Sequence, residues 1–116
     1  MRILVLDDEP EILEIVSKWL SARGHQPHAT ANATHALKLV GAGAFDAVLL
    51  DLIMPQTNGL NLISKIHELK PGLPVIVMSV IDDLRIGVIA AKEQIEAYVT
   101  KPIDFEKLAE ILHNLH

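Results

Sequence analysis

The feature that most restricts the fold of this chain is a series of five short runs with strand character, separated by segments with helical periodicity. The runs cover residues 3–6, 26–29, 47–50, 74–78 and 97–100. Most of them lack the alternation of apolar and polar residues that a half-exposed strand shows, which predicts burial on both faces, as in a parallel sheet. The run at 26–29 is weaker and contains Pro27, which has no backbone donor, so we expect it toward a sheet edge.

The segments between these runs carry apolar residues at helical spacing. We expect helices from about residue 12 to Gly24, from Asn32 as a cap to about 41–43, and over about 59–70, 82–93 and 104–115. The predicted inward faces of four of them are Ile12, Ile15, Val16, Trp19 and Leu20; Ala33, Ala36, Leu37 and Val40; Leu62, Ile63 and Ile66; and, after a cap at Asp104, Phe105, Leu108, Ile111, Leu112 and Leu115. The helix over 82–93 is apolar around its whole circumference, with Leu84, Ile86, Val88 and Ile89.

Alternating strands and helices predict an α/β fold of the flavodoxin-like kind. We expect a doubly wound five-stranded parallel sheet, (βα)5, with helices on both faces and residues 1–116 forming one domain. A ligand of such an open sheet binds outside the carboxyl ends of the strands.

Composition argues against several classes of protein. The apolar runs are far shorter than the roughly 18 residues of a membrane span, and the chain turns acidic at Asp7, unlike a secretory signal. The net charge is -5 and the ten Lys and Arg residues are scattered, which argues against nucleic-acid binding. We therefore expect a soluble protein that binds neither membrane nor nucleic acid, and the absence of cysteine fits a location in the cytoplasm.

Five polar residues stand at the carboxyl ends of the predicted strands: Asp7, Asp8, Asp51, Ser79 and Lys101. In a parallel sheet these ends share one edge, so the side chains should converge there. Like charges about 4 Å apart repel by roughly 4 kcal/mol at an effective dielectric of 20, and one lysine cannot balance three carboxylates.

A divalent cation would supply the missing charge, and an oxygen-only set of ligands favours Mg²⁺ or Mn²⁺ over zinc. Such an ion often completes its shell with phosphate oxygens, which points to phosphoryl chemistry. We therefore assign Asp51 as the nucleophile and expect Lys101 and Ser79 to stabilise the phosphoryl oxygens.

A longer set of residues in this order and spacing carries a family resemblance. It consists of Asp7-Asp8, the run Asp51-Leu52-Ile53-Met54-Pro55 leading to Gly59, Ser79, Tyr98 and Lys101-Pro102. Over essentially its full length the chain resembles the response-regulator receiver domain of two-component signalling.

The resemblance implies a role for each matching residue. Asp51 looks like the phosphoacceptor, and Asp8, Asp51 and the backbone carbonyl of Ile53 look like ligands of Mg²⁺. Asp7 looks like a ligand that acts through water.

The remaining matches imply a switch. Ser79 would hydrogen-bond the phosphoryl group, Lys101 would pair with it, and the Lys101-Pro102 bond resembles the family's cis peptide. Tyr98 would be the aromatic residue that turns inward when Ser79 moves.

The implied function is that of a signalling switch rather than an enzyme, although it would catalyse its own phosphoryl transfer and slow self-dephosphorylation. A histidine kinase or histidine phosphotransfer protein would donate the phosphoryl group from phosphohistidine. The fourth helix, the fifth strand and the fifth helix would then bind an output domain or a downstream protein, with Ile86 and Ile89 in an exposed patch beside Tyr98. A phosphorylation-dependent homodimer is a further expected association.

Some positions depart from the family pattern. Val80 follows Ser79 where a small residue is common, and we expect its bulk to slow phosphorylation by small donors. Gln94-Ile95 replaces a common Gly-Ala, which affects the surface of the fourth helix. Because Ile53 and Ile81 are apolar, nothing polar there orients water, and we expect slow hydrolysis of the acyl phosphate.

Two other functions remain open. A phosphatase or phosphotransferase of the haloacid dehalogenase type also uses an Asp nucleophile, but it predicts an acid where this chain has Ile53 and a cap domain for which there is no room. A receiver-like module that never accepts phosphate is the other, and Val80 keeps it open. Taken singly, Asp7 and Asp8 could also be helix-starting acids and Ser79 a helix cap.

Overall fold

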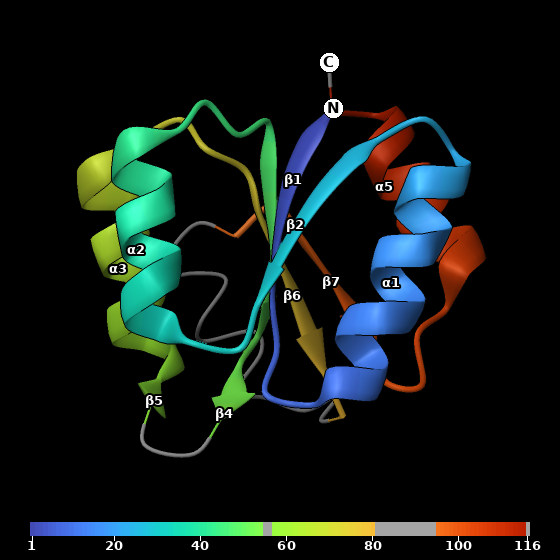
Figure 1. The fold of residues 1–116 in the computed structure, drawn as a ribbon, viewed down its shortest axis with the longest axis horizontal. Helices are drawn as coiled ribbons and strands as arrows, with labels where there is room; N and C mark the ends of the chain where they lie inside the picture. Colours follow the sequence, from blue (N-terminus) through green and yellow to red (C-terminus); the bar gives the residue numbers. More distant parts are fainter. Residues whose placement is uncertain (55–56, 81–94, 116) are drawn as a thin grey trace.

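A computed structural model describes residues 1–54, 57–80 and 95–115, and its centre is a five-stranded parallel sheet (Figure 1). The strands are β1 (Arg2–Leu6), β2 (Gln26–Thr30), β3 (Ala47–Asp51), β6 (Val75–Ser79) and β7 (Ala97–Thr100). They lie in the order β2-β1-β3-β6-β7, and every neighbouring pair is parallel. The predicted sheet is confirmed, and the strand that contains Pro27 is at an edge, as expected.

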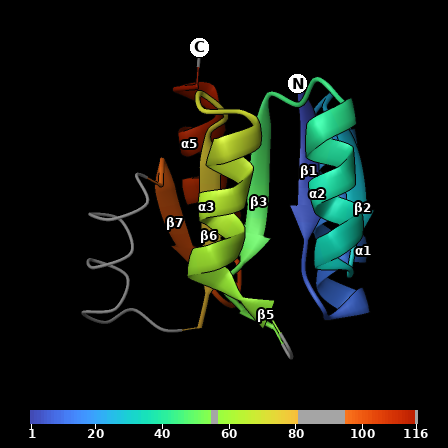
Figure 2. The ribbon, with the colours of Figure 1, turned by 90° about the vertical axis from the view of Figure 1, so that its left-hand side faces the viewer.

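Helices cover both faces of the sheet, as predicted. They are α1 (Pro10–Ala22), α2 (Ala33–Ala42), α3 (Gly59–Leu69) and α5 (Phe105–His113). In Figure 1 the pair α2 and α3 lies on one side of the strands and the pair α1 and α5 on the other. Figure 2 shows the row of strands from β7 to β2 behind α2 and α3. The helix expected over 82–93, with Ile86 and Ile89, lies outside the described residues.

The strands divide the apolar core in two because successive side chains point to opposite faces. On β1, Leu4 and Leu6 pack toward α2 and α3, whereas Ile3 and Val5 pack toward α1 and α5. The same alternation recurs on β3 and β6, which are buried along their whole length. These central strands therefore hold their carboxyl ends in a fixed place.

The helix ends mostly follow the sequence signals. His35 N–H donates to the Asn32 side chain at 2.8 Å, and Lys107 N–H donates to the Asp104 side chain at 3.1 Å, so both predicted caps are confirmed. Beyond α1, Gly24 has a φ of 86°, which suits a residue without a Cβ.

One predicted inward residue is wrong. Ile15 is 51% exposed, whereas Val16 and Leu20 of the same helix are buried. At 3.6 residues per turn, Ile15 lies about 100° around the axis from Val16, at the margin of the apolar stripe. No helix among the described residues is long and apolar enough to cross a membrane.

A small ladder between β3 and α3 was not predicted. β4 (Ile53–Met54) pairs antiparallel with β5 (Thr57–Asn58), and the two form a sheet of their own. Asn58 then caps α3, because its side chain accepts a hydrogen bond from Asn61 N–H at 3.2 Å. Strands of two residues carry no periodicity from which they can be predicted.

The first residue of α3 packs closely against the segment that leaves β3. A Cβ at Gly59 would lie 2.6 Å from the backbone oxygen of Leu52, whereas a Cβ at Gly41 of α2 would find only Leu69 Cδ2, at 3.9 Å. We expect Gly59→Ala to lower the free energy of unfolding by about 1–3 kcal/mol through overpacking. The control Gly41→Ala should leave it unchanged or raise it by about 0.5–1 kcal/mol. Urea denaturation measures both, and equal effects of the two substitutions would contradict this packing.

Candidate functional site

The carboxyl ends of the strands bring the predicted site residues to one edge of the sheet. Asp7 directly follows β1, Asp51 ends β3, Ser79 ends β6 and Lys101 directly follows β7. Backbone pairing continues past the strands: Lys101 N–H donates to the Ser79 carbonyl at 2.8 Å, and Asp7 N–H donates to the Thr30 carbonyl at 3.3 Å. Their backbone positions are therefore fixed by the sheet itself.

The centre of this edge is a buried lysine between two buried carboxylates. Lys101 Nζ lies 2.7 Å from Asp7 Oδ2 and 3.1 Å from Asp51 Oδ2. The three side chains are 7%, 0% and 5% exposed, respectively. Lys101 therefore contacts the carboxylates that follow β1 and end β3 at the same time.

The second oxygen of each aspartate is held by its own loop. Glu9 N–H donates to Asp7 Oδ1 at 2.9 Å, and Ile53 N–H donates to Asp51 Oδ1 at 3.1 Å. Both are turns in which an aspartate binds the backbone two residues ahead. Each carboxylate consequently directs one oxygen to the backbone and the other to Lys101. Within the part of the chain that the structure describes, the 2.7 Å ion contact with Lys101 Nζ is the polar contact given for Asp7 Oδ2.

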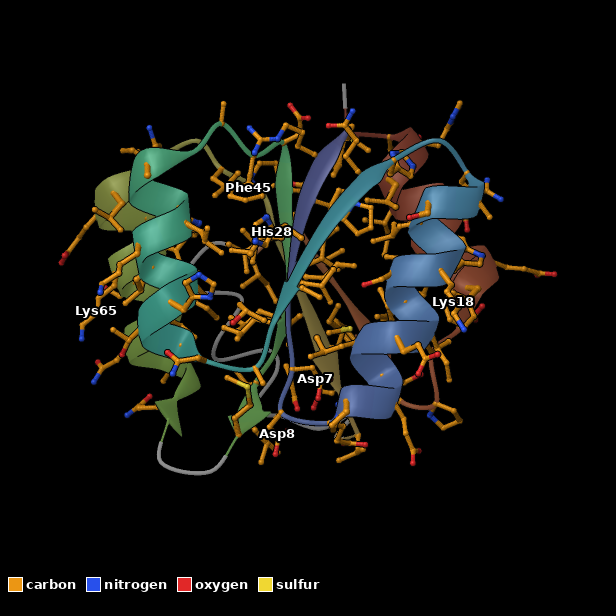
Figure 3. The ribbon with its side chains drawn as sticks, in the orientation of Figure 1. Asp7, Asp8, Lys18, His28, Phe45 and Lys65 are labelled. Carbon is orange, nitrogen blue, oxygen red and sulfur yellow. The ribbon has the colours of Figure 1, made fainter. Side chains whose placement is uncertain are left out.

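Four carboxylates gather here. One oxygen each of Asp7, Asp8, Glu9 and Asp51 can be chosen so that all lie within 4.8 Å of one another. Figure 3 shows Asp7 and Asp8 together at the edge toward which the strand arrows point. These oxygens fit a hard divalent cation such as Mg²⁺ or Mn²⁺, because the donor set contains no sulfur or nitrogen.

Glu9 is the site residue that the sequence analysis missed. Its Oε1 lies 3.4 Å from Lys101 Nζ, and the residue stands at the N-cap of α1 without a side-chain capping bond. Its position directly after the Asp7-Asp8 pair was the available signal.

The site holds more negative charge than Lys101 balances. Burial, with the neighbouring Asp7 charge adding to it, raises the pKa of Asp51 to about 6, although the Ile53 N–H and Lys101 act in the opposite direction. For Lys101, burial disfavours the charged form, but Asp7 and Asp51 outweigh it and raise its pKa above the ordinary value. Lys101 therefore keeps its proton, and Asp51 is the carboxyl group whose charged form is disfavoured.

Ser79 ends β6, and Tyr98 lies on β7 three residues before Lys101. Ser79 is 1% exposed and follows Met78, which pairs with Asp51 across β3 and β6. Tyr98 is half-buried against the core on the side of α2 and α3, with Lys107 Nζ 4.8 Å from its ring centroid. The Lys101-Pro102 bond is cis, as expected.

Two apolar side chains stand exposed directly beside the site residues. Val80, next to Ser79, is 67% exposed, and Ile53, two residues after Asp51, is 51% exposed. Ile81 and Gln94, which the sequence analysis also singled out, lie outside the described residues.

Comparison with known proteins identifies what the chain is similar to. A family model for the response regulator receiver domain matches residues 3–113. The DNA-binding transcriptional regulator NtrC of Azospirillum brasilense is 36% identical over 95% of this chain, and NtrC of Rhizobium meliloti is 33% identical over 95%. The chain spans only 23% of the length of either relative.

Solved structures agree with this match. The response regulator TrrA of Thermotoga maritima, in complex with Mg²⁺ and beryllofluoride, has a TM-score of 0.88 and 31% identity, with 99% of this chain and 98% of that chain covered. A CheY-like receiver domain protein of Methanospirillum hungatei has a TM-score of 0.89 and 29% identity, with 98% and 92% covered.

The pKa of Asp51 gives a pH dependence to stability. Folding raises this pKa from 3.8 to about 6, so the folded chain binds the proton more tightly than the unfolded chain does. The free energy of unfolding should therefore fall as the pH rises through this window, by an amount on the order of 1–3 kcal/mol. In chelator, we expect Asp51→Asn to remove this decline and to be the more stable protein at pH 7, but not at pH 4.

Urea denaturation at several pH values measures the effect. Glu68→Gln, which removes an exposed carboxylate from α3, is the matched control and should keep the decline. Parallel pH profiles for the native chain and Asp51→Asn would contradict the raised pKa.

Proposed function

The chain belongs to the response regulator receiver domain family of two-component signalling, and we propose that it accepts a phosphoryl group on Asp51. The donor is the phosphohistidine of a histidine kinase or a histidine phosphotransfer protein. The observation that carries the proposal is the position of Asp51, almost buried between the Lys101 ammonium and the acidic cluster at the carboxyl edge of the sheet.

The ammonium and the carboxylates around Asp51 suit an aspartate nucleophile in phosphoryl transfer, because that reaction depends on positioning and charge neutralisation. An oxygen of Asp51 attacks phosphorus in line, a P–O bond forms, the P–N bond of the donor breaks, and the departing imidazole takes a proton from water. Lys101 is already 3.1 Å from Asp51 Oδ2 and would neutralise charge on a phosphoryl oxygen held there. Ser79, at the adjoining strand end, would donate a hydrogen bond to another.

The acidic cluster would hold Mg²⁺ in this reaction. Asp8 and Asp51 would bind it directly with the Ile53 backbone carbonyl, and Asp7 would act through water. Bound there, the ion supplies positive charge to the phosphoryl oxygens. Glu9, whose oxygen belongs to the same cluster, would strengthen the negative potential that attracts the cation.

Phosphorylation would act as a switch because the new dianion has strong partners. About 5.5 kcal/mol of differential stabilisation moves a two-state balance from 1:99 to 99:1, and Lys101, Ser79 and Mg²⁺ would provide much of it. Tyr98 of β7 is the aromatic residue that would turn inward when Ser79 moves toward the phosphoryl group. The surface of segment 81–94, β7 and α5 would then bind an output domain, a downstream protein or a second copy. We place this switch in the cytoplasm, with slow self-dephosphorylation limited by the apolar Ile53.

A hydrolytic enzyme of the haloacid dehalogenase type is the weaker alternative, since Ile53 offers no acid beside Asp51. Turnover of a phosphate ester would favour it. A module that never accepts phosphate would fail to bind beryllofluoride in the presence of Mg²⁺.

Mass spectrometry after treatment with acetyl phosphate and Mg²⁺ tests the phosphoacceptor. We expect the native chain to gain one phosphoryl group and Asp51→Ala to gain none, because the attacking oxygen is absent. Asp46→Ala removes an exposed carboxylate at the start of β3, at the other edge of the sheet, and should label like the native chain. Labelling of Asp51→Ala to the native extent would refute the assignment.

Val80 should govern access by small donors. Its side chain is 67% exposed beside Ser79, so it can narrow the approach to Asp51. We expect Val80→Ala to raise the rate of labelling by acetyl phosphate by about three- to tenfold, which corresponds to about 0.7–1.4 kcal/mol in the barrier. Val80→Thr keeps the bulk and should label at the native rate. Equal rates for Val80→Ala and the native chain would contradict a role of Val80 in restricting access to Asp51.

A further inference from the structure

A hollow lies at the opposite edge of the sheet from Asp51. Its volume is about 480 Å³, within the range of small-molecule pockets, and it lies between α1 and α5. Its described lining includes Met1, Arg23 and His25 on one side and Ala109, Leu112 and His113 of α5 on the other. Figure 1 shows the amino terminus and the carboxyl ends of α1 and α5 at this edge.

The polar part of the lining is basic. It comprises the Met1 ammonium, the Arg23 guanidinium and the imidazoles of His25 and His113, and no carboxylate belongs to the described residues that line the hollow. The chain as a whole has a net charge of -5, so this local excess of positive charge runs against the composition. An anion is therefore the ligand that its charge favours.

The basic groups are held in place before any ligand arrives. Met1 N lies 3.1 Å from His25 Nδ1, and because an ammonium only donates, Nδ1 accepts and Nε2 carries the imidazole proton. The Arg23 guanidinium lies over the Trp19 ring, with Cζ 5.0 Å from the centroid. Burial, followed by the charges of the N-terminus and Arg23, lowers the pKa of His25.

Compensation of helix dipoles does not account for all of these groups. Arg23 is the C-cap of α1, and His113 is in the last turn of α5, where cations are favourable. Each helix end contributes only about half a negative charge. The positive charges of Arg23 and the Met1 ammonium alone exceed the combined negative charge of the two helix ends. His25 lies beyond the end of α1.

We propose that this hollow binds a small organic phosphate with at least two negative charges. The phosphate contacts Arg23, His25 and the Met1 ammonium, and the organic part packs on Ala109 and Leu112. Leu112 is 2% exposed and closes the apolar side. The five residues of β1, at about 3.3 Å each, separate this hollow from the acidic edge, so it is distinct from the phosphoacceptor site.

An NMR titration with inorganic pyrophosphate in chelator tests the proposal, because the acidic edge without Mg²⁺ repels that probe. At constant ionic strength we expect saturable amide shifts at Arg23, His25, Ala109 and Leu112. Arg23→Gln should weaken binding at least tenfold. Ala109→Glu, which adds a carboxylate at a half-buried position of α5, should abolish it. Lys18→Gln removes the same charge from an exposed site on α1, where Lys18 pairs with Glu14 at 2.8 Å, and should change the affinity less than twofold.

Amide spectra of the variants that match the native spectrum away from the hollow confirm that they are folded. Shifts that do not saturate, that spread over all basic residues, or that centre on Asp7 and Asp51 would overturn the proposal. Equal weakening by Arg23→Gln and Lys18→Gln would overturn it as well, since that result indicates charge screening rather than a site.

Discussion

The contact on which this structure most depends is the buried Lys101 ammonium between the carboxylates of Asp7 and Asp51. Its three groups come from the ends of β1, β3 and β7, which the strand order β2-β1-β3-β6-β7 brings to one edge. Removing Lys101 would leave the two buried carboxylates without a compensating charge, which is strongly destabilising. The sheet topology and the chemistry of its edge are therefore a single constraint: the order of strands that buries the core also determines which charges meet.

The negative charge at this edge exceeds the positive charge, because among the described residues one ammonium faces a cluster of four carboxylates. Burial, with the Asp7 charge adding to it, raises the pKa of Asp51 and reduces stability near neutral pH. The same excess favours any cation that binds the folded chain, since binding to the native state alone stabilises it. A site that lowers stability when empty and gains it on binding cation and phosphoryl group has the energetics of a switch.

Much of this arrangement follows from sequence alone, and the exceptions have physical reasons. Pro27 correctly placed β2 at an edge, and Asn32 and Asp104 were recognised as caps from residue type and position. Strand ends placed Asp51 beside Lys101 because parallel strands share an edge. Ile15 was misassigned because the helical stripe has a margin that periodicity alone does not define, and the β4–β5 ladder is too short to carry a pattern. Glu9 was missed because its role depends on how the chain turns into α1.

We propose that strand order assembles one pocket in which Asp51, Lys101 and Ser79 contact the same phosphoryl group. A crystal structure of the chain with Mg²⁺ and beryllofluoride is the most direct test of this pocket. We expect beryllium on an oxygen of Asp51, with Lys101 Nζ and the Ser79 hydroxyl contacting the fluorines and the cation among the carboxylates. Beryllofluoride on Asp8 or Glu9, or a Lys101 side chain turned away from Asp51, would contradict it.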